Sequence, residues 1–211
     1  ASEPSALRSL PESLPGAKRN ERAVASVATK VKDSDVRHNH SGRVPSKRGA
    51  FVQAVVFHEF GGSDVLRLEE LPDPEPGPGE VVVDVTASAL NHLDVDVREG
   101  VSRFPVAFPH VLGVEPVGRI SALGAGVEGW QEGDRVAVYL MAVCGGCSYC
   151  RSGRESLCTA PAWFVSMGSG GAHAEKVLCK DTQLIRVPDG VSDVAAAAGH
   201  IAFGTAWHML V

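Results

Sequence analysis

The sequence predicts a mainly β protein, folded as a compact β-barrel with a few helices and one cysteine-rich lobe. The first observation behind this prediction is a series of short apolar stretches separated by turns, in a chain of 211 residues that holds 23 Gly and 13 Pro. The second is a hydrophobic share of 44%, which is enough for one domain with a core. The third is that all but one of the 5 cysteines lie within residues 144–158.

The first fifty residues differ from the rest of the chain. They carry 10 Lys and Arg against 5 Asp and Glu, and they contain no Phe, Trp or Tyr. Such a segment cannot bury enough apolar surface to offset the entropy lost on ordering it. We therefore predict that residues 1–50 form a disordered basic tail or an upstream segment from outside the natural domain, and that the folded domain covers residues 51–211. The alternatives are a nucleic-acid-binding arm and a transit peptide, and the scattered acids disfavour both.

The apolar stretches of the folded part have the alternation and the β-branched residues of strands. A Pro- and Gly-rich connector at residues 72–80 separates the first two stretches from the others. We expect strands over residues 53–60, 65–72, 80–90, 109–124, 133–141, 172–179 and 182–190.

Two segments are predicted to be helical. NHLDVDVREG, residues 91–100, fits one short helix that Gly100 closes. The last segment, residues 190–211, fits a longer helix for which Ser192 is a favourable N-cap.

Composition and charge exclude several classes of function. The apolar runs are too short to span a bilayer, and residues 1–50 contain no apolar core of a signal peptide. The residues after position 50 carry 10 basic against 20 acidic side chains, which argues against a nucleic-acid partner. We therefore expect a cytoplasmic protein that has neither a membrane nor a nucleic acid as its partner.

The clustered cysteines, Cys144, Cys147, Cys150 and Cys158, follow the pattern C-x2-C-x2-C-x7-C. Disulfides are disfavoured because cytosolic thiols are kept reduced. The start of the pattern also fits an iron–sulfur ferredoxin run, but that run continues C-x3-C-P, whereas here the gap is longer and Thr159 follows. Four thiolates form a closed tetrahedral zinc site, which leaves no position open for a substrate. We therefore predict one structural Zn ion held by these four side chains.

Around this lobe the sequence resembles the medium-chain dehydrogenase/reductase superfamily. The resemblance covers residues 53–211 and rests on the order AVVFHEFGG, PGPGEVVVDVTASALNHLD, PHVLGVEPVGRISALGAGVEGWQEGDRV, the cysteine lobe, GGAHAEKV and LIRVPDGVS. It implies the GroES-like, partly open β-barrel of the catalytic domain shared by zinc-containing alcohol dehydrogenases and quinone oxidoreductases. It also implies NAD(P)H as the cofactor, a small-molecule carbonyl or alcohol as the substrate, and a homo-oligomer at full length.

The Rossmann domain of that family is expected to be absent from this chain. GAGVEG, at Gly124, Gly126 and Gly129, fits G-x-G-x-x-G, but the dinucleotide fingerprint requires a helix directly after the glycines. Here WQEGDRV follows and leads into a predicted strand. In the family, the nucleotide-binding domain begins soon after the helix that matches residues 190–211. We therefore expect a fragment that is inactive by itself.

The resemblance also indicates where a catalytic zinc would be held. Family members that have one use a Cys, a His and a further Cys, at the positions of Asn91, Val114 and Ile201 in this sequence. Asn binds zinc poorly and Val cannot bind it. The proton-relaying Ser or Thr of those members is Leu93 here. We therefore expect a structural zinc without a catalytic zinc.

Asn91, with Asp94 three residues later, resembles the quinone oxidoreductase branch, whose members transfer hydride from a reduced nicotinamide to a conjugated carbonyl. Without a metal, the charge that develops on the carbonyl oxygen must be met by hydrogen-bond donors, and the Asn91 amide is our candidate catalytic group. His92 is a candidate group near the cofactor or substrate, with a solvated or hydrogen-bonded structural histidine as the alternative. Thr205 matches a family position beside the nicotinamide. Asp94 is expected to organise its loop.

Plainer alternatives stay open for the same residues. Asn91 precedes a helix and is a favourable N-cap. Glu115 matches an acid near the zinc of metal-using relatives, and without that ion a structural hydrogen-bonding role is expected. His200 is a weak candidate ligand because its partners are missing. Two other functions also stay open, a non-catalytic zinc-stabilised binding or scaffold module and a zinc-dependent alcohol dehydrogenase.

Overall fold

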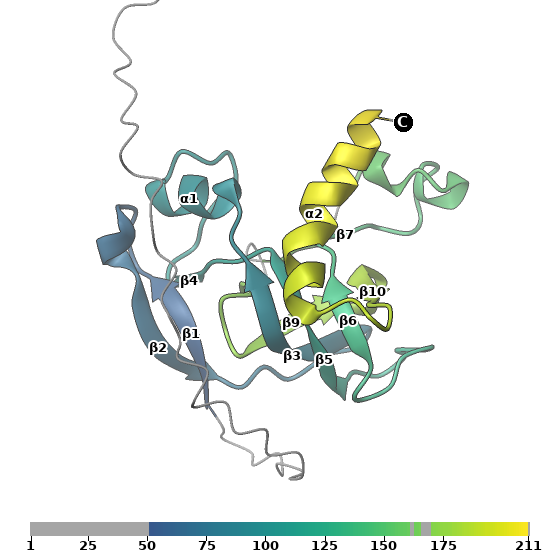
Figure 1. Cartoon of the computed structure of the whole chain (residues 1–211), viewed down its shortest axis with the longest axis horizontal. Helices are drawn as coiled ribbons and strands as arrows, with labels where there is room; N and C mark the ends of the chain where they lie inside the picture. Colours follow the sequence, from purple (N-terminus) through teal and green to yellow (C-terminus); the bar gives the residue numbers. More distant parts are fainter. Residues whose placement is uncertain (1–50, 161–162, 166–169, 211) are drawn as a thin grey trace, which may run out of the picture. The chain divides into compact units, whose positions relative to one another are not determined.

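The structure, a computed structural model, describes residues 51–160, 163–165 and 170–210 (Figure 1). In this part of the chain the strands form three sheets, all with antiparallel pairing, and two α-helices accompany them. The predicted mainly β fold with few helices is confirmed. None of the described sheets closes into a barrel. The tail predicted for residues 1–50 lies outside the described residues.

The first sheet has the order β2-β1-β4. Its central strand β1, Phe51–Phe57, pairs along its length with β2, Arg67–Pro72, and near its end with β4, His110–Val111. The alternation in β1 turns Ala54 and Val56 inward against Val111, and these three side chains form a small buried cluster.

The second sheet has the order β10-β6-β5-β3-β9 and contains the larger core. Its strands are β3 (Glu80–Ala89), β5 (Glu115–Leu123), β6 (Arg135–Val138), β9 (Lys176–Lys180) and β10 (Leu184–Arg186). Val83 on β3 stands between Ile120 on β5 and Val177 on β9 in register, and all three side chains are buried. Each side chain of this kind stabilises the fold by about 1.5–3 kcal/mol when fully buried.

The single strand expected over residues 109–124 is divided in two, which corrects that prediction. Gly113 interrupts it with a φ of +102°, in the left-handed region that favours glycine. A Cβ atom there would lie 2.7 Å from the backbone nitrogen of His173, so a side chain has no room. The break sends β4 into the first sheet and β5 into the second.

The strand expected over residues 133–141 is also divided, into β6 and the short β7 (Met141–Ala142). β7 leaves the second sheet and pairs with β8 (Trp163–Phe164) to form the third sheet. The cysteine-rich segment lies between β7 and β8 in the chain.

Both predicted helices are confirmed. α1, His92–Glu99, follows Asn91 at the N-cap position and ends at Gly100, whose φ of 74° is left-handed. α2, Asp193–Leu210, follows Ser192, whose Oγ accepts the N–H of Ala195 at 3.2 Å. No helix in the described ranges is long and apolar enough to cross a membrane.

α2 packs on β3, β5 and β6 (Figure 1). Its first residue, Asp193, accepts a hydrogen bond from Thr86 Oγ1 on β3 at 2.6 Å and one from Arg135 Nε on β6 at 2.5 Å. Ala197, one turn later, is buried against Val117 and Ala137. One carboxylate and one small side chain therefore fix the helix on the sheet.

Asp193→Asn is expected to lower the free energy of unfolding by about 1 kcal/mol at neutral pH, because it removes a charge-assisted pair that is partly open to solvent. The hydrogen bond from Thr86 and the nearby Arg135 hold the pKa of Asp193 below its ordinary value. A carboxyl with a lowered pKa stabilises the fold above its ordinary pKa and loses that effect as the pH falls through the lowered one. Urea unfolding of both proteins over the acid range should show the difference between them shrinking with falling pH.

Asp189→Asn is the matched control, because Asp189 is exposed in the loop before α2. It should leave the unfolding free energy within about 0.5 kcal/mol of the parent protein at each pH. An Asp193→Asn effect that does not vary with pH would contradict the role given to this ion pair.

Candidate functional site

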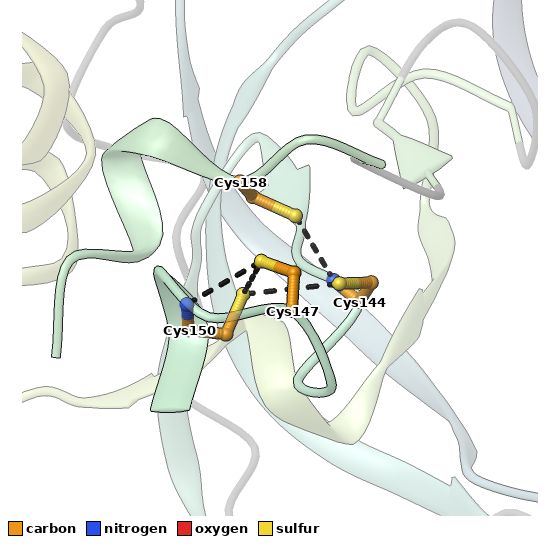
Figure 2. Close-up of side chains that lie close together, drawn as sticks. All are labelled: Cys144, Cys147, Cys150 and Cys158. Carbon is orange, nitrogen blue, oxygen red and sulfur yellow. Dashed lines mark hydrogen bonds between the residues drawn. The ribbon is translucent and has the colours of Figure 1, made fainter. Parts of the chain in front are cut away.

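The cysteine lobe, residues 144–158, leaves β7 and turns back on itself in two short 3-10 helices, Cys150–Ser152 and Glu155–Leu157. Gly145 and Gly153 have φ values of 65° and 70°, so the two sharpest turns require glycine. These turns bring four cysteine side chains together within one loop (Figure 2).

The four sulfur atoms of the lobe all lie within 4.8 Å of one another. The Sγ of Cys150 is 3.4 Å from that of Cys147 and 3.9 Å from that of Cys144, and none of the cysteines forms a disulfide. In a tetrahedral site with metal–sulfur bonds of about 2.3 Å, the sulfurs stand about 3.8 Å apart. An iron–sulfur cluster would hold them farther apart, because its own iron and sulfide atoms lie between them. The cysteine set therefore fits a single metal ion.

Backbone N–H groups prepare two of the thiols for a metal. The N–H of Cys150 donates to the Sγ of Cys147 at 3.4 Å and lowers the pKa of Cys147 to about 5. The N–H of Cys144 donates to the Sγ of Cys158 at the same distance and lowers the pKa of Cys158. Burial raises the pKa of Cys150 to about 12, and a bound cation deprotonates such a thiol.

A second group of polar side chains gathers where α1, β5 and α2 meet. Asn91, before α1, donates from Nδ2 to Oε2 of Glu115 at 2.6 Å. Oε1 of Glu115 accepts the backbone N–H of Ile201, within α2, at 2.7 Å. Glu115 is the first residue of β5 and is only 2% exposed. We call Asn91, Glu115 and Ile201 the carboxylate bridge.

Asp94 organises the loop beside the carboxylate bridge, as predicted. Its Oδ2 accepts the N–H of Asn91 at 2.8 Å and its Oδ1 accepts the N–H of Gly113 at 3.0 Å. Nε2 of His173 lies 3.8 Å from Oδ2 of Asp94, and Nδ1 of His173 lies 3.1 Å from Oγ of Ser88. Asp94 thus joins the start of α1 to the break between β4 and β5.

The positions that hold a catalytic zinc in metal-using relatives come close together here without metal-binding side chains. Asn91 and Ile201 belong to the carboxylate bridge, and Val114, next to Glu115, is a buried core residue. Within the described ranges, only the cysteine lobe brings three or more His, Cys, Asp or Glu ligand atoms together.

The two residues assigned to the cofactor occupy different surroundings. Thr205 lines a groove of about 400 Å³ together with His200 and Ile201 on α2, and Ser156 of the cysteine lobe lines the same groove. His92 has a side chain that is 88% exposed and lies 3.3 Å from Asp96 on the outer face of α1. The structure therefore brings Thr205 to the carboxylate bridge and leaves His92 apart from it, and both cofactor roles stay predictions.

Sequence reasoning missed the contacts that α2 makes with Glu115. Glu115 and Ile201 are 86 positions apart in the sequence. Every residue except proline has a backbone N–H, so the sequence does not indicate which one donates to Glu115. His200, whose Nδ1 lies 3.7 Å from Oε1 of Glu115, had been considered only as a metal ligand. The one available signal was an acid, Glu115, directly before the apolar residues of β5.

Comparison with known proteins finds similarity to alcohol dehydrogenases and to a reductase. The family model "Alcohol dehydrogenase GroES-like domain" matches residues 77–189. The chain is 38% identical over 151 residues to an alcohol dehydrogenase of Moraxella sp. (69% of this chain, 43% of that protein). It is 38% identical over 137 residues to an acryloyl-coenzyme A reductase of Sulfurisphaera tokodaii (64% of this chain, 40% of that protein).

A solved structure agrees with these matches. The cobalt- and zinc-bound thermostable alcohol dehydrogenase from Pyrobaculum aerophilum superposes with a TM-score of 0.70 at 30% identity, over 76% of this chain and 48% of that chain. The chain thus spans less than half the length of each of these three relatives, 43%, 40% and 48%.

Cys147→Ser tests the metal site. Loss of one thiolate weakens binding of the ion, and binding free energy at such a site is folding free energy. We expect the purified variant to contain less than the one metal equivalent per chain of the parent protein, measured by elemental analysis, and to unfold at lower urea concentration. A chelator should shift the parent protein in the same direction.

Cys179→Ala is the control for this experiment, because Cys179 is a buried thiol on β9, outside the lobe. It should retain the full metal content whatever its effect on stability. Equal metal content in the Cys147→Ser and Cys179→Ala proteins would rule out the four-cysteine site.

Proposed function

Because the chain belongs to the alcohol dehydrogenase GroES-like domain family, we propose that it is the catalytic domain of an NAD(P)H-dependent reductase with a structural zinc and no catalytic zinc. Its substrate is a small molecule in which a carbonyl is conjugated to a carbon–carbon double bond. The observation that carries this proposal is the Asn91 amide, which Glu115 holds where metal-using relatives have a zinc-binding Cys.

The cysteine lobe supports the structural part of the proposal. Four thiolates around one zinc ion leave no open position, so the ion shapes the loop and does not meet the substrate. Ser156 of this lobe lines the groove beside α2, and a fixed lobe therefore gives that groove one fixed wall.

The carboxylate bridge supports the reductive part. Hydride from a bound reduced nicotinamide would add to the β-carbon of the conjugated double bond. The carbonyl oxygen would then carry the negative charge of an enolate, and a proton from solvent would complete the reduction at the α-carbon. Nδ2 of Asn91 gives one hydrogen to Glu115 and has a second one to give to that oxygen. Thr205 lines the groove one helical turn beyond Ile201, where its hydroxyl can orient the cofactor ring.

One kind of relative supports the same substrate class. An acryloyl thioester, named for the Sulfurisphaera tokodaii relative, carries a carbonyl conjugated to a double bond. Alcohol dehydrogenases are equally similar in sequence, so a zinc-dependent alcohol dehydrogenase is the second candidate. Val114 and Ile201 disfavour it, because neither side chain can bind an ion.

The same proposal includes three further points: a cytoplasmic location, a homo-oligomer at full length, and a domain border between residues 50 and 51.

The decisive experiment is an assay of the complete gene product. NADPH and NADH oxidation should be measured with acryloyl-coenzyme A, simple enones and quinones, beside alcohol oxidation with the oxidised cofactors. We expect reduction of a conjugated acceptor with one zinc per chain. Alcohol oxidation that requires a second zinc would establish the second candidate, and the absence of any turnover would favour a non-catalytic binding or scaffold module.

Asn91→Ala is expected to lower kcat for the conjugated acceptor by about 100-fold, the usual effect of removing one donor from a developing oxyanion. The zinc content should not change, because Asn91 lies outside the cysteine lobe. Steady-state kinetics and elemental analysis of the full-length variant check both points.

Ser192→Ala is the matched control, since it also removes a polar N-cap side chain, here from α2. It should cost about 1 kcal/mol of stability and leave kcat within about twofold. If the two variants lost the same activity, Asn91 would act only as a helix cap.

A further inference from the structure

Glu115 is the most constrained polar side chain of the carboxylate bridge. A carboxylate that is only 2% exposed is costly unless donors satisfy both of its oxygens. Those donors are Nδ2 of Asn91 at 2.6 Å and the N–H of Ile201 at 2.7 Å. His200 Nδ1, at 3.7 Å from Oε1, is too far for a hydrogen bond, so two N–H groups from different elements meet the charge.

The first consequence concerns the direction of the Asn91 amide. The oxygen and nitrogen ends of an asparagine amide have nearly the same shape, so only hydrogen bonding decides which way it points. An ionised carboxylate can only accept, so Glu115 favours the NH2 end of the amide. The capping box of α1, in which the N–H of Asp94 meets the Asn91 side chain, favours the same direction. The second hydrogen on Nδ2 has no acceptor among the described residues.

The second consequence concerns α2. The N–H of Ile201 lies well inside the helix, where a regular helix would direct it to the carbonyl of residue 197. Its bond to Glu115 ties this turn of α2 to the start of β5. Thr205, one turn later, lines the groove, so the same carboxylate locates both the amide and the groove wall.

We propose that Glu115 is a positioning residue: its carboxylate fixes the Asn91 amide with the NH2 group toward the substrate side and sets the distance from that amide to α2. This inference rests on the proposed function, in which Asn91 donates to the substrate carbonyl. Glu115 then affects kcat by holding Asn91 in place, in addition to its effect on the stability of the fold.

Glu115→Gln tests this inference because it keeps the size and removes the charge. A Gln side chain accepts one N–H but presents its own NH2 to the other donor, so one of the two bonds is lost. In the full-length protein we expect kcat to fall about 10- to 100-fold and the KM for the nicotinamide cofactor to change less than about threefold. In an Asn91→Ala background, the same substitution should change kcat by less than about threefold, because the group it positions is gone.

Glu80→Gln is the matched control. Glu80 also accepts a backbone N–H, from Gly77 at 2.9 Å, and pairs with Lys180 Nζ at 2.9 Å, but it stands at the start of β3, outside the carboxylate bridge. This variant should lose stability and keep its kcat within about twofold in both backgrounds. If Glu115→Gln does not fold, Glu115→Asp, which keeps the charge and shortens the reach, is measured in the same cycle.

A second readout does not depend on activity. The side-chain amide of Asn91 gives a pair of 15N–1H signals, assigned by their loss in Asn91→Ala. They should move toward the positions of a free amide in the Glu115 variant and stay in place in Glu80→Gln. Equal kcat losses from Glu115→Gln in both backgrounds, or unchanged Asn91 signals, would overturn the positioning role. An inactive parent protein would refute the proposed function, while the amide signals would still decide the role of Glu115.

Discussion

The junction of α1, β5 and α2 depends on the hydrogen bonds of one buried carboxylate. Each carboxylate oxygen of Glu115 needs a hydrogen-bond donor, because a buried oxygen without one would lower the free energy of unfolding by about 1–3 kcal/mol. One donor is Asn91, directly before α1, and the other is the backbone N–H of Ile201, inside α2. Three elements from distant parts of the chain are therefore held in one arrangement, and one of the three residues, Ile201, also lines the groove beside α2.

The fold separates two kinds of cross-link. In the cysteine lobe, thiolates from one short loop converge on a single point, which suits an ion whose binding stabilises a segment with almost no core of its own. At the carboxylate bridge, hydrogen bonds join segments that already have a core beneath them, from Val117, Ala137 and Ala197. The first kind fixes a loop, and the second holds the start of α1, the start of β5 and the middle of α2 at hydrogen-bond distance from one another.

The sequence predicted features that depend on neighbouring residues, such as helix ends and the cysteine ligands. It did not predict contacts between residues that are distant in the chain. Gly100 and Ser192 indicated helix ends because a helix cap depends on the residue type at that position. The cysteine spacing indicated the metal site because all four ligands lie close together in the chain. The division at Gly113 was missed because apolar residues continue on both sides of it, and its positive φ and the closeness of His173 appear only in the folded chain. The bond from Ile201 to Glu115 was missed because every residue type has a backbone N–H.

The hydrogen bonds of Glu115 also bear on whether a cation can share the cleft. Each of its oxygens already accepts one N–H group, so a metal ion that used the remaining lone pair would share that oxygen with a donor and weaken a charge-assisted bond of about 1.5–3 kcal/mol. The neighbours at Val114 and Ile201 offer no ligand in exchange. An asparagine amide, in contrast, needs one acceptor and keeps one hydrogen for a substrate oxygen. In the proposed function, Glu115 therefore holds the Asn91 amide as the donor to the substrate carbonyl, and that is the physical reason to expect polarisation by hydrogen bonding at this site.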